Sequence, residues 1–167
     1  MATPEGFAEF VVARQAALLR TAYLLTGNAH DAEDLVQTTL IKVVPQWRRI
    51  GDNPEPYVRR VLVNENVSRW RRRRWREETT DELPETLAAS PDHVELMAVR
   101  SALAGLARQQ RAVLVLRYYE GWTEAEIADQ LGISPGTVKS HARDGMARLR
   151  LALPAEERSM AGGPPVA

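Results

Sequence analysis

Residues 123–150, TEAEIADQLGISPGTVKSHARDGMARLR, constrain the fold of this chain more than any other stretch. Thr123 and Glu126 have the spacing of a capping box, which satisfies free N–H groups at the start of a helix. Gly132 is placed to end that helix, because glycine adopts the left-handed conformation at little cost. Ser134 and the proline that follows it are typical of the start of a second helix. Two short helices joined by a tight glycine turn predict a helix-turn-helix.

The second predicted helix has an apolar face and a polar face. In a helix-turn-helix the N-terminal half of this helix enters the DNA major groove, so its hydrogen-bonding groups would lie against base edges. An ordinary helical hairpin with a solvated polar face is the alternative, but the caps, the turn and the positive charge together favour DNA binding. Gly145 is expected to weaken this helix by about 1 kcal/mol relative to alanine. The apolar face carries Val138, Ala142, Met146 and Leu149, and the polar face carries Thr137, Lys139, Ser140, Arg143, Asp144, Arg148 and Arg150.

Composition narrows the class of protein further. The 167 residues are enough for one medium domain or two small ones, and a hydrophobic content of 44% supports folded cores. The absence of cysteine excludes disulfides and thiolate metal sites, and it is compatible with a reducing cytoplasm. No apolar run is long enough to span a bilayer, and the N-terminus MATPEGFAEF lacks the form of a signal peptide. We therefore expect a soluble cytoplasmic protein that does not act at a membrane.

The net charge of zero, from 22 basic and 22 acidic side chains, hides a strong segregation of charge. Residues 69–76, RWRRRRWR, are basic and include two tryptophans, whereas residues 77–95 contain seven acidic side chains and no Lys or Arg. A basic run interleaved with tryptophan can neutralise phosphates and stack on unpaired bases. A solvated, partly frayed helix end is the alternative interpretation of the basic run.

The rest of the chain also has helical periodicity, with no internal repeat and no strand alternation. Gly27 is expected to end the first helix and Asn28 to cap the second. The carboxylates of Asp31, Glu33 and Asp34 then lie in a first helical turn, where the helix dipole alone explains them at least as well as a binding role does. Besides the helix-turn-helix, helices are predicted over residues 5–26, 28–47, 56–76 and 111–119 and from residue 91 onward, with a loop at residues 51–56. The predicted fold class is therefore all-α, with two small helical domains joined by an acidic flexible linker.

No catalytic chemistry is visible in the sequence. The three histidines are scattered over different elements, and none has a second ligand at metal-site spacing. No glycine-rich phosphate loop, nucleophile elbow or catalytic dyad occurs. We therefore predict no cofactor, no metal site and no enzymatic activity.

Three stretches resemble one known family. HDAEDLVQTTLIKVVPQW is similar to region 2.2, and PEPYVRRVLVNENVSRWRRRR to regions 2.3 and 2.4, of the group IV (extracytoplasmic function, ECF) sigma factors of the bacterial sigma-70 family. ARQQRAVLVLRYYEGWTEAEIADQLGISPGTVKSHARDGMARLR is similar to region 4 of the same family. The resemblance extends over residues 7–151 and is strongest to the short actinobacterial SigE-type members. It divides the chain into region 2 (1–76), a linker (77–91), region 4 (92–153) and a disordered tail (154–167).

The resemblance implies two macromolecular partners, core RNA polymerase and promoter DNA. It implies that the largest polymerase subunit binds one helix through its clamp helices, that the polymerase flap is a second contact, and that the acidic linker passes through channels of the polymerase. An anti-sigma factor is left open as a further partner, and the free protein is expected to be a monomer. The implied polymerase contacts are Asp31, Asp34, Leu35, Gln37 and Thr38. The implied −10 DNA contacts are Asn53, Arg59, Arg60, Asn64, Arg69, Trp70, Arg72 and Arg73, and the implied −35 contacts are Ser134, Thr137, Lys139, Ser140, Arg143 and Arg148.

The sequence departs from the family pattern at three points. The recognition helix carries HARDG where basic or bulky residues are commoner, and the −10 helix carries a denser arginine run than many relatives. The third departure is at a turn. Leu106 is followed by Ala107 where the family usually has proline, which predicts a looser turn.

Two other functions remain open at this point. One is a stand-alone helix-turn-helix regulator of the kind that ends response regulators, and the other is an adaptor that binds only protein.

Overall fold

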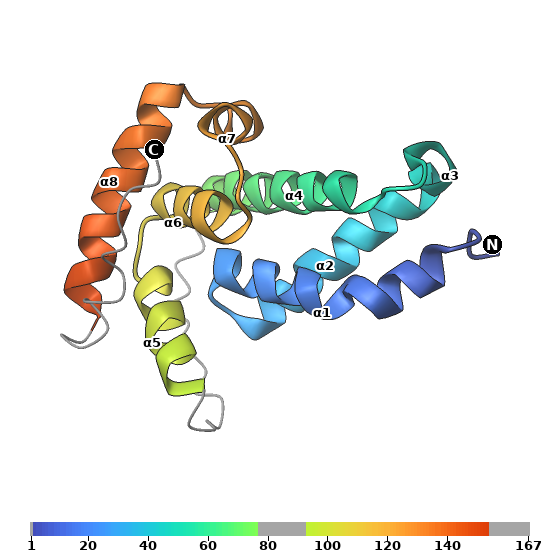
Figure 1. The fold of residues 1–167 in the computed structure, drawn as a ribbon, viewed down its shortest axis with the longest axis horizontal. Helices are drawn as coiled ribbons and strands as arrows, with labels where there is room; N and C mark the ends of the chain where they lie inside the picture. Colours follow the sequence, from blue (N-terminus) through green and yellow to red (C-terminus); the bar gives the residue numbers. More distant parts are fainter. Residues whose placement is uncertain (1, 77–92, 154–167) are drawn as a thin grey trace. The chain divides into compact units, whose positions relative to one another are not determined.

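The computed structural model describes residues 2–76 and 93–153, and within them the chain forms helices, turns and loops without a β-strand. The chain divides into two compact units, which carry the helices before and after the predicted linker (Figure 1). The all-α prediction with two helical domains is confirmed. The predicted linker at 77–91 and the predicted tail at 154–167 lie outside the described residues. None of the described helices combines the length and the apolar character that crossing a membrane requires.

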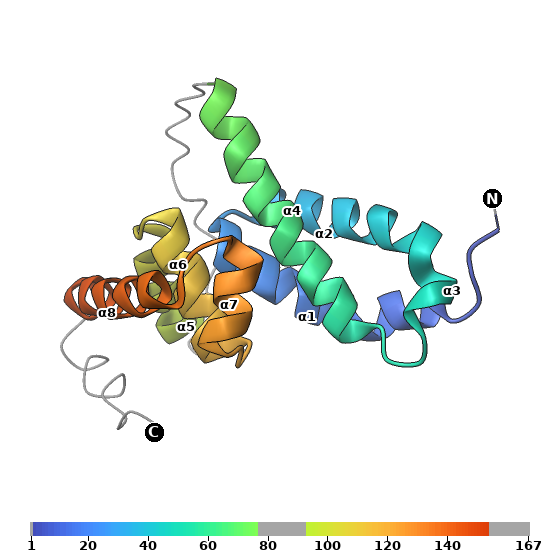
Figure 2. The same cartoon turned by 90° about the horizontal axis from the view of Figure 1, so that it is seen from above.

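The first unit is built around helix α2, which packs against both α1 and α4. Figure 2 shows the last turns of α4 extending past α1 and α2. The core contains leucines from three helices, among them Leu18, Leu35 and Leu62, each at most 1% exposed. The elements of this unit are α1 (Phe7–Thr26), α2 (Ala29–Val43), the 3₁₀ turn η1 (Val44–Gln46), α3 (Trp47–Ile50) and α4 (Glu55–Arg76).

Local cap chemistry sets the junction between α1 and α2. Gly27 has a φ of 73°, and its N–H donates to the Tyr23 carbonyl 2.8 Å away, which closes α1 as predicted. The Asn28 side-chain oxygen accepts a hydrogen bond of 3.1 Å from the Asp31 N–H, so the predicted cap of α2 is also confirmed.

An aromatic cluster ties the start of α1 to α3. The rings of Phe7 and Phe10 each lie 5.1 Å from the Trp47 ring, centroid to centroid. The Trp47 indole N–H donates a hydrogen bond of 2.9 Å to the Glu5 carbonyl. The 3₁₀ turn η1 interrupts the helix predicted over residues 28–47, because Pro45 has no N–H to continue the helical pattern.

In the second unit, α6 packs along α8, and α5 also contacts α8. The helix predicted over residues 111–119 begins earlier, at Arg108, and its last turn is a π-helical turn that ends before Gly121, which has a φ of 73°. The elements are α5 (His93–Ala104), α6 (Arg108–Leu114), the π turn η2 (Val115–Tyr119), α7 (Glu124–Leu131) and α8 (Pro135–Ala152).

Arg111 closes the turn between α5 and α6. Its guanidinium donates hydrogen bonds to the carbonyls of Leu103 at 2.9 Å, Ala104 at 3.0 Å and Leu106 at 3.2 Å. Leu103 and Ala104 lie in the last turn of α5, where carbonyls have no partner within the helix, and Leu106 lies in the turn itself. Burial of the guanidinium, together with the nearby charge of Arg108, lowers the pKa of Arg111. The turn that was expected to be loose is therefore held by a buried cation from the following helix.

The helix-turn-helix forms as the sequence predicts. The Thr123 N–H donates to the Glu126 carboxylate at 2.8 Å, and the Glu126 N–H donates to the Thr123 hydroxyl at 3.2 Å, which completes the capping box. Gly132 has a φ of 66° in the turn, and the Ser134 hydroxyl accepts from the Thr137 N–H at 3.1 Å at the start of α8.

Gly145 has a packing role that the sequence analysis missed. A Cβ atom at this position would lie 3.2 Å from Leu114 Cδ1 and 3.3 Å from Gln110 Cβ, both on α6. Contacts this short are uncommon for a Cβ atom and would require Leu114 or Gln110 to shift by a few tenths of an ångström, so the close approach of α8 to α6 suits glycine. Gly145 therefore has a place in the packing of α8 on α6 in addition to its expected cost in helix propensity.

We expect Gly145→Ala to lower the free energy of unfolding by about 1 kcal/mol, because overpacking of a close helix contact costs more than the gain in helix propensity. Chemical denaturation followed by circular dichroism measures this change. Gly136→Ala is the matched control in the same helix, because its added Cβ would make only an ordinary contact of 3.8 Å with the Ser134 hydroxyl. A Gly145→Ala protein that is more stable than the original would contradict the packing role.

Candidate functional site

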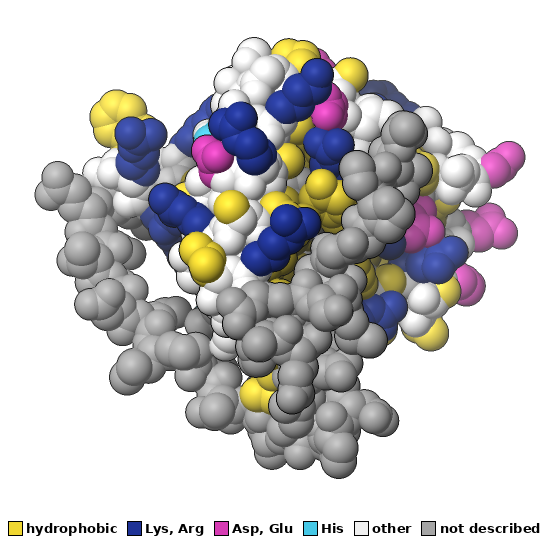
Figure 3. Space-filling model, turned by 60° about the vertical axis from the view of Figure 1, so that its left-hand side comes forward, with side chains coloured by type: hydrophobic (Ala, Val, Ile, Leu, Met, Phe, Trp, Pro, Cys, Tyr) yellow, Lys and Arg dark blue, Asp and Glu magenta, His cyan; other side chains and the backbone are white. Residues whose placement is uncertain are grey.

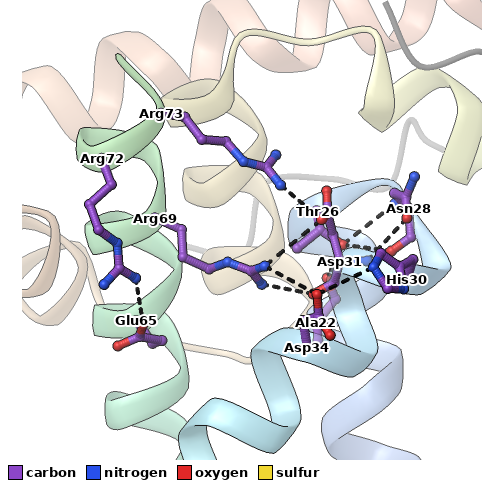
Figure 4. A network of polar contacts seen from close by, with 10 residues as sticks. All are labelled: Ala22, Thr26, Asn28, His30, Asp31, Asp34, Glu65, Arg69, Arg72 and Arg73. Atoms are coloured by element: carbon purple, nitrogen blue, oxygen red, sulfur yellow. Dashed lines mark hydrogen bonds and ion pairs between the residues drawn. The ribbon is translucent and has the colours of Figure 1, made fainter. Parts of the chain in front are cut away.

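The predicted polymerase-binding carboxylates and part of the predicted DNA-binding run meet in one network (Figure 4). Arg73 donates a hydrogen bond of 2.8 Å to the Asp31 carboxylate. Arg69 donates to the Asp31 carbonyl at 2.9 Å, and its guanidinium lies 3.8 Å from the carboxylates of both Asp31 and Asp34. His30 Nε2 lies 3.5 Å from the second of these carboxylates. The start of α2 and the end of α4 are therefore joined by charged side chains.

The members of the predicted polymerase-binding set differ in exposure. The Asp31 side chain is only 14% exposed, whereas that of Asp34 is 46% exposed. Leu35 is fully buried and belongs to the core, so its side chain supports the helix from within. Gln37 is exposed and Thr38 is half-buried. Within the predicted set, Asp34, Gln37 and Thr38 are therefore the members whose side chains are most open to solvent.

A second ionic cluster joins α2 to α4 further along and was missed by the sequence analysis. The Glu65 carboxylate, 3% exposed, accepts hydrogen bonds from Lys42 on α2 and, at 2.8 Å, from Arg72 on α4. Burial by itself raises the pKa of Glu65, but the hydrogen bonds and positive charges of these two side chains outweigh it, so the pKa lies below its ordinary value. The sequence did contain a signal for this cluster. Glu65 follows Val58 and Leu62 at helical spacing, which places an acidic residue on the apolar face of an otherwise basic helix.

The other predicted −10 contacts have different surroundings. Arg59 donates a hydrogen bond of 2.8 Å to Glu55 and one of 3.3 Å to the Thr21 hydroxyl, and both bonds lie within this unit. The exposed contacts are Asn53, in the loop before α4, and Arg60 and Asn64, on the helix itself. Trp70 is half-buried.

The predicted −35 contacts lie along α8, and several are restrained by neighbouring side chains. The hydroxyls of Ser134 and Thr137 lie 2.8 Å apart in the cap, and the Ser140 hydroxyl donates to the Gly136 carbonyl at 3.1 Å. The Lys139 ammonium lies 3.8 Å from the Glu124 carboxylate on α7. That carboxylate, which the sequence analysis did not single out, also accepts a hydrogen bond of 2.9 Å from Arg117.

Further along α8, the cations stay open to solvent. The Arg143 side chain is 77% exposed, and its Nε lies 3.3 Å from the carboxylate of the adjacent Asp144. Arg148 is also exposed. His141 on α8 shares a hydrogen bond of 3.0 Å with Gln109 on α6, and this bond joins the middle of α8 to α6. Figure 3 brings the side of the molecule that bears α8 forward and shows Lys and Arg side chains scattered over it.

Comparison with known protein families matches both units. The family of sigma-70 region 2 matches residues 10–76, and the family of sigma-70 region 4 matches residues 96–149. These ranges coincide with the helices α1–α4 and with the helices that lead into and form the helix-turn-helix.

Individual relatives agree with the family matches. The RNA polymerase sigma-E factor of Streptomyces coelicolor is 40% identical over 155 residues, which cover 90% of this chain and 88% of that protein. The ECF RNA polymerase sigma factor SigL of Mycobacterium tuberculosis is 37% identical over 147 residues, with 83% of each chain covered. Among solved structures, the sigma factor RpoE from Bartonella quintana, in complex with the anti-sigma factor NepR, superposes with a TM-score of 0.68 at 27% identity, covering 89% of this chain and 97% of that chain. The chain therefore belongs to the sigma-70 family of RNA polymerase sigma factors and, within it, to the extracytoplasmic function group.

Proposed function

We propose that the protein is an alternative sigma factor that binds core RNA polymerase and directs promoter-specific transcription initiation. The observation that carries the proposal is the presence of region 2 and region 4 in one chain, each as a folded helical unit. The matched region 2 disfavours a stand-alone helix-turn-helix regulator, because such a protein needs no such unit. The sigma factor family is not a family of enzymes, and we assign no catalytic residue; the polymerase carries out the chemistry, in the cytoplasm.

The two units have separate tasks in this proposal. The polymerase contacts are Asp31, Asp34, Gln37 and Thr38 on α2, with Leu35 holding the helix from the core side. The loop residue Asn53 and helix α4 bind and help to open the −10 element, for which cations and aromatic side chains suit the displaced strand. The N-terminal half of α8 reads the −35 element in the major groove.

Run-off transcription on a pool of genomic fragments, with purified core polymerase and with or without the protein, tests the proposal. The expected result is a set of new, discrete start sites that share an upstream pair of −35 and −10 sequences. Absence of new starts, together with shifted bands in a DNA-binding gel, would instead support the stand-alone regulator. Absence of both signals would support a role limited to protein partners.

We expect Arg143→Ala to weaken recognition of the −35 element by about 1–3 kcal/mol, because an exposed guanidinium in the major groove can bind a base edge with two hydrogen bonds. Fluorescence anisotropy of the holoenzyme on the promoters from the run-off assay, with substitutions in the −35 element, measures the change. Arg150→Ala is the matched control, since it removes the same charge near the C-terminal end of the helix. If Arg143→Ala leaves discrimination among −35 sequences intact, Arg143 does not read bases.

The solved sigma factor RpoE was crystallised with an anti-sigma factor, NepR. We propose a protein of this class as a further partner of the present chain, supported by the likeness in fold. Affinity purification of the tagged chain from its native cells, followed by mass spectrometry, checks this expectation.

A further inference from the structure

A row of three charged side chains in the second unit ends at Lys139, in the first half of α8. Arg117 in η2 donates a hydrogen bond of 2.9 Å to Oε1 of Glu124, in the first turn of α7. The other carboxylate oxygen of Glu124, Oε2, lies 3.8 Å from the Lys139 ammonium. Arg117 has a further contact, because its guanidinium carbon lies 5.5 Å from the centroid of the Tyr118 ring, within the range of cation–π attraction. The Glu124 carboxylate is therefore held by one cation while it acts on the other.

The exposure of these groups shows that the contact with Lys139 is not there for stability. The side chains of Glu124 and Arg117 are 29% and 33% exposed, whereas that of Lys139 is 68% exposed. An ion pair with so exposed an ammonium contributes little to the stability of a fold. At 3.8 Å the pair is also longer than a hydrogen bond, so the carboxylate restrains the ammonium without occupying its N–H donors.

We infer that Glu124 is a positioning residue that determines sequence specificity, because it holds Lys139 toward base edges and away from phosphates. This inference rests on the proposed function, in which the N-terminal half of α8 lies in the major groove of the −35 element. A lysine is a flexible point charge, and phosphate is a common ligand for it. A carboxylate beside the ammonium repels a phosphate strongly, whereas a base edge carries only partial charges and is repelled much less. The base expected at Lys139 is guanine, whose O6 and N7 atoms are the acceptors that lysine binds in the major groove.

The first test measures which −35 sequences the holoenzyme selects. Holoenzyme assembled from core polymerase and the full chain is bound to promoter duplexes with a randomised −35 element, and the bound fraction is sequenced. Glu124→Gln keeps the size of the side chain and removes its charge, so Lys139 is no longer kept from a phosphate. The preference for guanine at one base pair is expected to fall about tenfold, while the preferences at the other positions stay the same.

The salt dependence of binding to a single promoter gives a second measurement. Each phosphate contact on a duplex contributes about 0.9 to the slope of log affinity against log salt. Glu124→Gln is expected to steepen this slope by about 0.9, because Lys139 gains a phosphate contact. Asp129→Asn is the matched control, since it removes an exposed carboxylate from the same helix and is expected to change neither the slope nor the base preferences.

A double variant shows whether Glu124 acts through Lys139. Lys139→Gln alone is expected to lose the same guanine preference, and Glu124→Gln added to it is expected to change neither preference nor slope further. The inference is overturned if Glu124→Gln keeps the base preferences and the slope of the original chain. It is also overturned if Glu124→Gln steepens the slope equally with and without Lys139. A lower melting temperature with unchanged base preferences would show that Glu124 only stabilises the fold.

Run-off transcription with the same variants keeps this inference distinct from the proposed function. If the original chain directs initiation and Glu124→Gln keeps every base preference, the sigma role stands and the positioning role is wrong. If the original chain directs no initiation, the full chain alone is bound to duplexes with a randomised segment. Loss of a single guanine preference in Glu124→Gln would then support the positioning role although the sigma role is wrong, and unchanged preferences would overturn both.

Discussion

Replacing Arg111 by methionine is expected to lower the free energy of unfolding of the second unit by about 3 kcal/mol, because the carbonyls it satisfies would lose a charged donor while remaining partly buried. The methionine fills much of the same space, so the change tests the hydrogen bonds of the guanidinium more than the packing of the side chain. The affected carbonyls are those of Leu103, Ala104 and Leu106. The expected result would show that the stability of the second unit depends on the hydrogen bonds that Arg111 makes in the turn between α5 and α6.

Denaturant unfolding followed through Trp122 measures this loss, because Trp122 is the one tryptophan of the second unit. Arg108→Met is the matched control, since Arg108 is exposed in the first turn of α6. Equal stability of the Arg111→Met and Arg108→Met proteins would show that the turn does not depend on the buried guanidinium.

The second large effect is expected at Glu65, where substitution by glutamine removes the negative charge that Lys42 and Arg72 share. We expect the free energy of unfolding to fall by about 2 kcal/mol at neutral pH, because hydrogen bonds to a charged group contribute about 1.5–3 kcal/mol and both cations are half-exposed. The same substitution removes the ion pair with Lys42 and so weakens the connection between α2 and α4.

The pH dependence of this effect has a definite sign. The pKa of Glu65 is lower in the folded protein than its ordinary value, so the folded state binds the proton less readily than the unfolded state does. The stabilisation is therefore complete above pH 4.5, the ordinary value, and is lost as the pH falls through the lowered pKa. Denaturation of the original chain and of Glu65→Gln across this window should show the two stabilities converging toward acid pH. A constant difference at all pH values would mean that the carboxylate charge is not the stabilising element.

Much of the fold was predictable because the signals for it are local. The caps at Asn28 and Ser134 and the glycine ends at Gly27 and Gly132 each depend on a few neighbouring residues, and each forms as predicted. The helix-turn-helix and the division into two helical units follow from such signals together with apolar periodicity. The roles of individual site residues are different, because they depend on which side chains the fold brings together.

Three features show this limit. Gly145 has the same helix propensity wherever it stands, and only the distance to Leu114 on α6 reveals that an added side chain would make a tight contact there. Glu65 and Arg72 are neighbours on one helix, but the second cation, Lys42, lies far away in the sequence. The sequence of the basic run does not distinguish its arginines, yet Arg73 is bound to Asp31 whereas no ion pair of Arg71 is found within the described residues.

The positions of most helices, their caps, the helix-turn-helix and the family resemblance could be predicted from the sequence, because periodicity and capping act over a few residues. Which charges neutralise one another and which stay exposed is visible only in the folded chain. Ion pairs such as those of Asp31 with Arg73 and of Glu65 with Lys42 join separate helices. Their formation depends on helix packing in three dimensions, which sequence spacing does not specify.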